Sequence, residues 1–250
     1  MITDLEYQQN APIETIFRIH NPTIRTARNN SRYLYCVLKD RTGQIPAYAW
    51  LDRYHGDQLE EKTLATVYGS MCCFADRWHV DISTATLAEI GTGNPLPYLP
   101  DDYSPVTNGV QRLEAILSQL KIMPLREFVL DVLRNDSVAL PFFALPASQK
   151  HHHAYAGGLL EHSLECAEFV IRATECMHEQ EELAVCAALL HDIGKTRTLN
   201  RTNRSLIGAL LGHDLLTLEL LAQPLAQSDR VWSDGSTAFR YLLSWKIHCS

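Results

Sequence analysis

The first ninety residues alternate between apolar and polar positions in short runs, which is the period of half-buried β-strands. The runs are rich in β-branched and aromatic residues, and turn-forming residues separate them. Five such strands within roughly 75 residues predict a small β-barrel. The five runs cover residues 15–20, 33–38, 45–50, 66–74 and 78–82.

The pattern changes in residues 91–107, where four prolines and two glycines prevent a regular element from continuing. Apolar residues then recur at helical spacing, beginning at Val110 behind a candidate N-cap at Asn108. Pro124 is suited to open a second helix. Further helices are predicted over residues 157–178, 180–193, 205–222 and 236–247.

These patterns predict an α+β multidomain protein. A barrel over residues 1–90 would be joined by a linker, 91–107, to an all-α domain over 108–250. We expect no disulfide framework, because the seven cysteines contain no Cys-x-x-Cys pair, and therefore a cytoplasmic location. We also expect no signal peptide and no membrane partner, because the N-terminus is acidic and the apolar stretches are short.

Charge and histidine content narrow the function. The formal net charge of −7 argues against a protein that coats DNA through bulk positive charge. Eight of the eleven histidines follow residue 150. His162, His191-Asp192, His213 and the triple His151–153 offer imidazoles and a carboxylate, which bind Mn, Fe, Ni or Zn. Asp192 directly follows an apolar run, so its burial would require a cation or several hydrogen bonds.

A non-metal alternative stays open for each histidine. A single histidine on an apolar helix face is more often a core residue with satisfied hydrogen bonds than a ligand, and the triple histidine could be a solvated loop.

The segment Gly157-Gly158-Leu159-Leu160-Glu161-His162-Ser163-Leu164, followed by Leu189-Leu190-His191-Asp192-Ile193-Gly194-Lys195, resembles the HD superfamily of metal-dependent phosphohydrolases. With His152-His153-Ala154-Tyr155 upstream and a barrel in front, the chain is most similar to YhaM-type 3′→5′ exoribonucleases, which join an OB-fold to an HD domain. The stretch from Leu145 to His162 also resembles the HD-type region of TraI-like conjugation proteins.

The resemblance implies a site with one or two divalent ions. Manganese is the first candidate, with Fe, Ni, Zn or Mg as alternatives. Asp192 would bridge two ions, and the family pattern expects a final Asp that does not follow His248. We therefore expect either a truncated chain or an incomplete site. The implied ligands are His162, His191, Asp192 and His213, with His152, His153 and His248 as further metal or substrate ligands.

Two basic runs are candidate contacts for an anionic substrate. Lys195, Arg197, Arg201 and Arg204 lie between Asp192 and Asp214 with no acidic residue among them. Lys195 is the first candidate for a phosphate contact and, with Asp192, a catalytic residue. The alternative is a solvated basic loop. The barrel carries a second acid-free run, Arg18, Arg25, Arg28, Arg32 and Lys39.

Tyr33 and Tyr35 share one face of a predicted strand, while Leu34, Cys36 and Leu38 share the other. The second face is more apolar, so we expect the tyrosines to point outward, where they could stack on unpaired bases. The alternative is that the rings fill the barrel core.

The leading hypothesis is a metal-dependent phosphodiesterase that trims single-stranded RNA or DNA from the 3′ end. A second hypothesis gives the HD chemistry a small nucleotide as substrate. A third is a catalytically degenerate, TraI-like HD module that binds nucleic acid. The sequence leaves the oligomeric state open.

Overall fold

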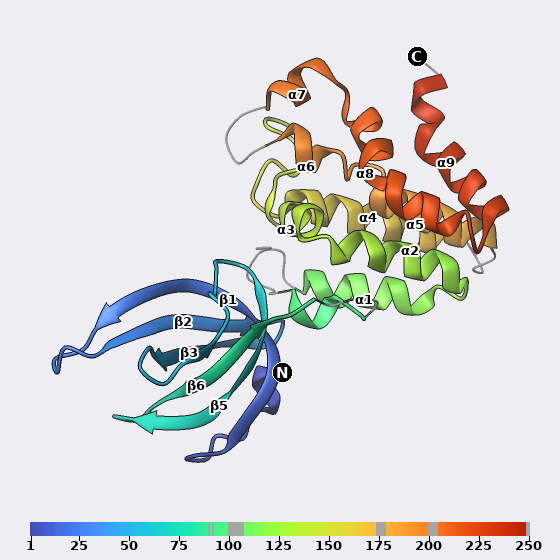
Figure 1. Ribbon diagram of the computed structural model, residues 1–250. Helices are drawn as coiled ribbons and strands as arrows, with labels where there is room; N and C mark the ends of the chain where they lie inside the picture. Colours follow the sequence, from blue (N-terminus) through green and yellow to red (C-terminus); the bar gives the residue numbers. More distant parts are fainter. Residues whose placement is uncertain (90, 92, 100–107, 174–178, 200–204, 249–250) are drawn as a thin grey trace. The chain divides into compact units, whose positions relative to one another are not determined.

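The computed structural model describes residues 1–89, 91, 93–99, 108–173, 179–199 and 205–248 (Figure 1). The chain divides into two compact units, Met1–Asp101 and Asp102–Ser250. The first contains the strands and the second the long helices. In the described part of the chain, no helix has the length and apolarity that crossing a membrane requires.

The first unit is a closed five-stranded barrel. β1 pairs with β2 and β5, β2 with β3, and β5 with β6, all antiparallel. A short parallel pairing of β3 with β6 closes the barrel, which gives the strand connectivity of an OB-fold. The strands are β1 (Pro12–Thr26), β2 (Arg32–Asp40), β3 (Gly43–Trp50), β5 (Leu64–Phe74) and β6 (Arg77–Leu87), with a two-residue β4 (His55–Gly56) and a 3-10 turn η1 (Ile2–Asp4).

Strand alternation decides which residues fill the barrel. Leu34, Cys36 and Leu38 on β2 are buried, and Tyr33 and Tyr35 are only half-buried on its other face. The tyrosines therefore point outward, as the pattern predicts. All five predicted strands are present. β1 is longer than expected because its first half, to Arg18, pairs with β5, and its second half, from Arg18, pairs with β2.

Arg18 corrects the interpretation of the barrel's basic run. Its side chain is fully buried and donates to the carbonyls of Tyr98 at 3.0 Å and Lys62 at 2.7 Å. It therefore holds three chain segments together from inside, and it is not part of a nucleic-acid surface. Arg25, Arg28 and Arg32 of the same run are exposed.

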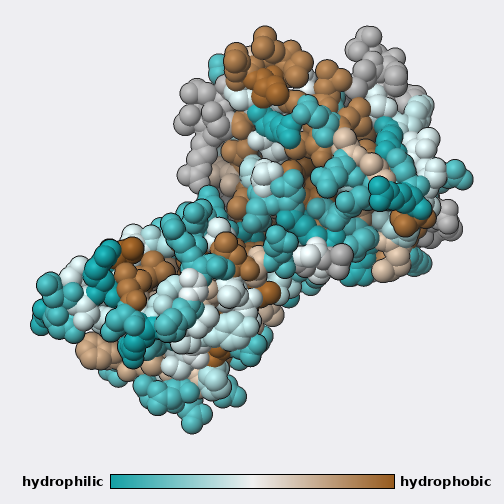
Figure 2. Space-filling model, viewed as in Figure 1, coloured by the Kyte–Doolittle hydropathy of each residue, from teal (hydrophilic) through white to brown (hydrophobic). Residues whose placement is uncertain are grey.

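The second unit is built from helices, and α4 packs against α5 (Figure 1). Their bounds are α1 (Gly109–Gln119), α2 (Met123–Arg134), α3 (Asp136–Ala144), α4 (Gly158–Ala173), α5 (Glu179–Leu190), α6 (Lys195–Thr198), α7 (Leu206–Leu210), α8 (His213–Ser228) and α9 (Ser233–His248). Figure 2 shows an apolar surface around α7, where Leu206, Ile207, Leu210, Leu211 and Leu215 are exposed.

The structure corrects four local predictions. The helix predicted over 205–222 is broken, because Leu211 and Gly212 are extended and a new helix begins at His213. α3 was not predicted; Pro141 argues against a helix there, but Asn135 caps its N-terminus by accepting from the Ser137 amide. Asn108 stands at the N-cap of α1 without a side-chain capping bond. The Pro/Gly-rich segment contains one 3-10 turn, η2 (Leu96–Tyr98).

Candidate metal centre

Three side chains from two neighbouring helices converge on one point. His162 lies in the first half of α4, while His191 and Asp192 directly follow the last residue of α5. The Nε2 atoms of His162 and His191 are 3.3 Å apart, and each lies 3.3 Å from Asp192 Oδ2. The predicted ligands therefore form a nearly equilateral triangle of two imidazole nitrogens and one carboxylate oxygen.

This triangle has the size of a metal site. Corners 3.3 Å apart lie about 1.9 Å from their centre, close to the roughly 2.1 Å of metal–imidazole and metal–carboxylate bonds. Two imidazoles and a carboxylate are also a usual donor set for divalent transition metals. The residues present therefore fit a divalent ion.

A backbone contact orients His191. Its Nδ1 lies 2.7 Å from the carbonyl oxygen of Ala188, so the Nδ1–H donates to that oxygen. The proton therefore resides on Nδ1, and the lone pair of Nε2 is directed at Asp192 and His162. A backbone carbonyl commonly holds a metal-binding histidine in this way.

Asp192 is the centre of the cluster, and only 3% of its surface is exposed. Its burial by itself raises its pKa, but the contacts of its carboxylate with the imidazoles of His162, His191 and His213 outweigh this effect and hold the pKa far below the ordinary value. Lys195, at the start of α6, contacts Oδ2 from 2.7 Å. The carboxylate is therefore ionised and in contact with three imidazole nitrogens and one ammonium group.

His213 completes the cluster from α8. Its Nε2 lies 3.0 Å from Asp192 Oδ1 and 3.4 Å from Asp214 Oδ1. The two oxygens of Asp192 thus face different groups, Oδ2 toward His162 and His191 and Oδ1 toward His213. The interruption between α7 and α8 at Leu211–Gly212 allows the contact between His213 and Asp192, because it places His213 at the first position of a new helix.

His153 lies beside the cluster, and His152 does not. The ring of His153 is 5.4 Å from that of His162, and its nitrogens contact Glu165 at 3.2 Å and the Tyr155 hydroxyl at 3.1 Å. His152 is exposed, and its backbone carbonyl accepts a hydrogen bond from the hydroxyl of Ser148. The side chain of His248 lies outside the described part of the structure.

The basic run after Asp192 is only partly available to a substrate. Arg197 forms an ion pair with Glu219 of α8 at 2.6 Å, an acid that the sequence run could not indicate because it lies 22 residues further on. Arg201 and Arg204 lie outside the described residues.

The sequence patterns did not indicate Cys166, a further residue near the cluster. It is half-buried, and its Sγ lies 3.8 Å from His162 Nδ1. It forms a possible ligand group with His162 and His191, whose donor atoms all lie within 4.8 Å of one another. We favour Asp192 as the third ligand, since its oxygen is nearer and charged. The position of Cys166, one helical turn after His162, was the available signal.

The barrel carries a second candidate surface, the aromatic face, made of Tyr33, Tyr35, Tyr48, Trp50 and His79. Tyr48 lies at its centre, with ring centroids 5.8 Å from Tyr33, 5.5 Å from Tyr35 and 5.0 Å from His79. The guanidinium of Arg25 lies 3.9 Å above the ring of Tyr35. The five residues of the aromatic face line a pocket of about 690 Å³ on the barrel. The sequence indicated Tyr33, Tyr35 and Arg25, but not His79.

Comparison with known proteins agrees with this site. Residues 159–232 match the HD domain family. The chain is 23% identical over 227 residues to the 3′-5′ exoribonuclease YhaM of Halalkalibacterium halodurans, covering 84% of this chain and 67% of the relative. It is 21% identical to the YhaM of Listeria innocua, covering 86% and 70%. The chain thus spans about two thirds of the length of these relatives.

Among solved structures, the second OB-fold domain of replication protein A from Methanococcus maripaludis matches 36% of this chain and 93% of that domain, at 16% identity and a TM-score of 0.27. The strand connectivity itself identifies the first unit as an OB-type barrel. The protein therefore joins an OB-type barrel to a helical unit that includes a match to the HD domain family, and most of the chain is similar in sequence to YhaM 3′-5′ exoribonucleases.

Proposed function

We propose that this protein is a metal-dependent phosphodiesterase that shortens single-stranded RNA or DNA from the 3′ end. The observation that carries the proposal is the triangle of His162, His191 and Asp192, which has the size and donor set of a divalent-ion site. Its position inside the region that matches the HD domain supports it, as do the exoribonuclease relatives.

In this proposal the barrel would bind the strand and the helical unit would cleave it. The aromatic face of the barrel offers rings on which successive bases can stack, and the exposed Arg25, Arg28 and Arg32 offer charge to the backbone. The helical unit offers the metal ligands. Local positive charge on the barrel resolves the apparent conflict between an anionic substrate and a protein of net charge −7.

The side chains of the cluster suggest distinct roles. A divalent ion, when bound, supplies a Lewis acid for the phosphoryl oxygen and a more acidic water. His162, His191 and Asp192 Oδ2 would hold that ion, and His213 with Asp192 Oδ1 would hold a second. Manganese is our first choice of metal. The ammonium of Lys195, placed by its contact with Asp192, would neutralise the phosphate that approaches this carboxylate.

We also propose a cytoplasmic location, since the five described cysteines are free thiols. The nucleic acid or nucleotide is the only partner that we propose.

The direct test uses single strands labelled at the 5′ end. Incubation with Mn²⁺ is expected to produce a ladder of products shortened from the 3′ end, and EDTA should abolish it. Asp192→Asn should also abolish it and reduce bound metal, as measured by elemental analysis, whereas Asp234→Asn in the first turn of α9 should change neither. Intact strands in the presence of Mn²⁺ would refute the proposal. Hydrolysis of free nucleotides without strand binding would instead support a nucleotide hydrolase, and strand binding by a metal-free protein would support a non-catalytic module.

A further inference from the structure

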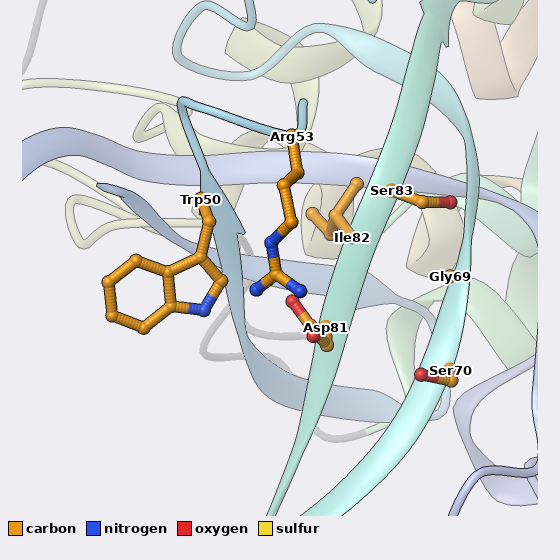
Figure 3. Close-up of a pocket in the computed structure, with 7 residues that line it drawn as sticks. All are labelled: Trp50, Arg53, Gly69, Ser70, Asp81, Ile82 and Ser83. Atoms are coloured by element: carbon orange, nitrogen blue, oxygen red, sulfur yellow. The ribbon is translucent and has the colours of Figure 1, made fainter. Parts of the chain in front are cut away.

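A pocket of about 330 Å³ opens at the seam that closes the barrel (Figure 3). β3 and β6 pair only at Ala47–Val80 and Tyr48–Asp81. Beyond Tyr48 the chain turns away from β6 and pairs with it again only at His55. The pocket lies in this interval, and its volume is at the lower end of the range for small-molecule sites. Its lining residues are Trp50, Arg53, Gly69, Ser70, Asp81, Ile82 and Ser83.

The floor of the pocket depends on a close approach of β5 to β6. A Cβ at Gly69 would lie 2.2 Å from the carbonyl oxygen of Asp81, so only glycine fits here. The pairing of β5 with β6 shifts register next to Gly69, and Ser83 of β6 donates from its hydroxyl to the Tyr68 carbonyl at 3.0 Å. The pocket is therefore a consequence of a β-bulge, a feature common at binding sites.

Two opposite charges face each other inside this pocket. Figure 3 shows the guanidinium of Arg53, from the turn after β3, directed toward the carboxylate of Asp81 on β6. Among the described residues, neither side chain has an ion pair within 4.0 Å. The pocket therefore presents a hydrogen-bond acceptor and a hydrogen-bond donor side by side, both available to a ligand.

The pocket continues the aromatic face. Trp50 and Asp81 line both this pocket and the larger pocket that contains Tyr33, Tyr35 and Tyr48. A strand whose bases stack on the aromatic face can therefore place its next base in the smaller pocket without leaving the barrel surface.

We propose that this pocket binds a guanine base of the single strand, an inference that rests on the proposed function and names a base preference for it. Guanine carries two adjacent donors, N1–H and the N2 amino group, which match the two oxygens of Asp81. Its O6 lies beside them and accepts from Arg53. Uracil offers one donor between two carbonyl oxygens, which Asp81 repels. Charge-assisted hydrogen bonds of this kind are among the strongest for selecting a base.

The test measures binding in EDTA, so that no strand is cut, with a fluorescent ten-residue oligouridine and the same strand carrying one guanine. The unmodified protein is expected to bind the guanine strand about tenfold more tightly, the effect of one good bidentate base contact. Asp81→Asn should reduce this ratio to about one. Asp52→Asn removes the same charge from an exposed position outside the pocket, and it should leave the ratio unchanged.

The ratio of the two affinities separates base recognition from bulk charge. Both variants lose one negative charge, which can strengthen binding of any strand, but this effect is the same for the two strands and cancels in the ratio. Equal affinities of the unmodified protein for the two strands would overturn the proposal. A preference of the Asp81→Asn variant for the guanine strand as large as that of the unmodified protein would also overturn it. Equal binding of a cytosine-containing strand would also overturn it. The Mn²⁺-dependent shortening of oligouridine on the same preparation tests the proposed function separately, so the two can fail independently.

Discussion

The hydroxyl of Thr217 donates to the carbonyl oxygen of His191 at 3.2 Å, and it accepts from the amide of Gly194 at 3.0 Å. Thr217 is buried on α8, with 1% of its surface exposed. It therefore ties α8 to the turn that carries His191 and Asp192. His213 lies one helical turn before Thr217 on the same helix, so this bond fixes the distance between His213 and Asp192.

Thr217→Val, which keeps the shape but removes the hydroxyl, is expected to lower metal affinity or the turnover number about 10- to 100-fold, the usual effect of removing a group that orients a ligand. Thr217→Ser should restore most of the loss, because it restores the hydroxyl. Calorimetric titration with Mn²⁺ and strand-shortening kinetics measure the two quantities. If serine and valine variants behave alike, Thr217 acts through packing and not through its hydrogen bonds.

Gly194 lies where α8 approaches this turn most closely. A Cβ there would lie 2.1 Å from the carbonyl oxygen of His213 and 2.6 Å from the amide nitrogen of Thr217, both backbone atoms that cannot rotate away. Gly194→Ala is therefore expected to displace α8, with a loss of about 1–3 kcal/mol in the free energy of unfolding and a loss of metal binding.

Gly212 offers the matched control. It precedes the same helix, has a φ of −70°, and a Cβ added to it would meet nothing within 4 Å. Gly212→Ala should leave both urea denaturation and metal binding unchanged. An equal effect of the two alanine substitutions would show that the loss does not come from the approach of α8.

The candidate site could be predicted largely from local sequence. His162, His191, Asp192 and His213 are recognisable because each is a metal-binding residue placed at a helix position next to apolar residues. The structure brings the three histidines into contact with the carboxylate of Asp192. Asp192 in particular follows a buried run, so its side chain had to be compensated within the core.

The remaining contacts depend on residues far apart in the sequence. Arg197 forms an ion pair with Glu219, and the buried Arg18 donates to the backbone carbonyl of Tyr98; neither partner adjoins the basic run that contains the arginine. Likewise the break before His213 arises where Leu211 and Gly212 are extended, although apolar periodicity continues through it. Periodicity reports which face is buried and not where the backbone changes direction.

Arg112 of α1 and Glu168 of α4 form a bidentate pair, with Nε–Oε1 and Nη2–Oε2 distances of 2.7 and 2.9 Å. Arg112 holds the pKa of Glu168 below its ordinary value through these hydrogen bonds. A carboxylate with a lowered pKa in the folded state stabilises the fold above its unfolded pKa of about 4.3, and this contribution disappears as the pH falls through the folded pKa.

A double-mutant cycle with Glu168→Gln and Arg112→Gln is therefore expected to give a coupling of about 1 kcal/mol at neutral pH, measured by urea denaturation. The coupling should vanish in acid, below the pKa of Glu168 in the folded state. A coupling that is the same at both pH values would mean that the pair interacts through packing of the side-chain stems and not through charge.

Tyr48 is the centre of the aromatic face, since its ring contacts those of Tyr33, Tyr35 and His79. Tyr48→Ala is expected to weaken binding of a single strand about 5- to 150-fold, because one stacked base contributes about 1–3 kcal/mol. Tyr48→Phe should bind normally, since stacking requires the ring and not the hydroxyl. Tyr68 is an exposed tyrosine on β5 that lines neither barrel pocket. Fluorescence anisotropy of a labelled strand in EDTA should therefore show no change for Tyr68→Ala, and equal losses for the two alanine variants would place the strand elsewhere on the barrel.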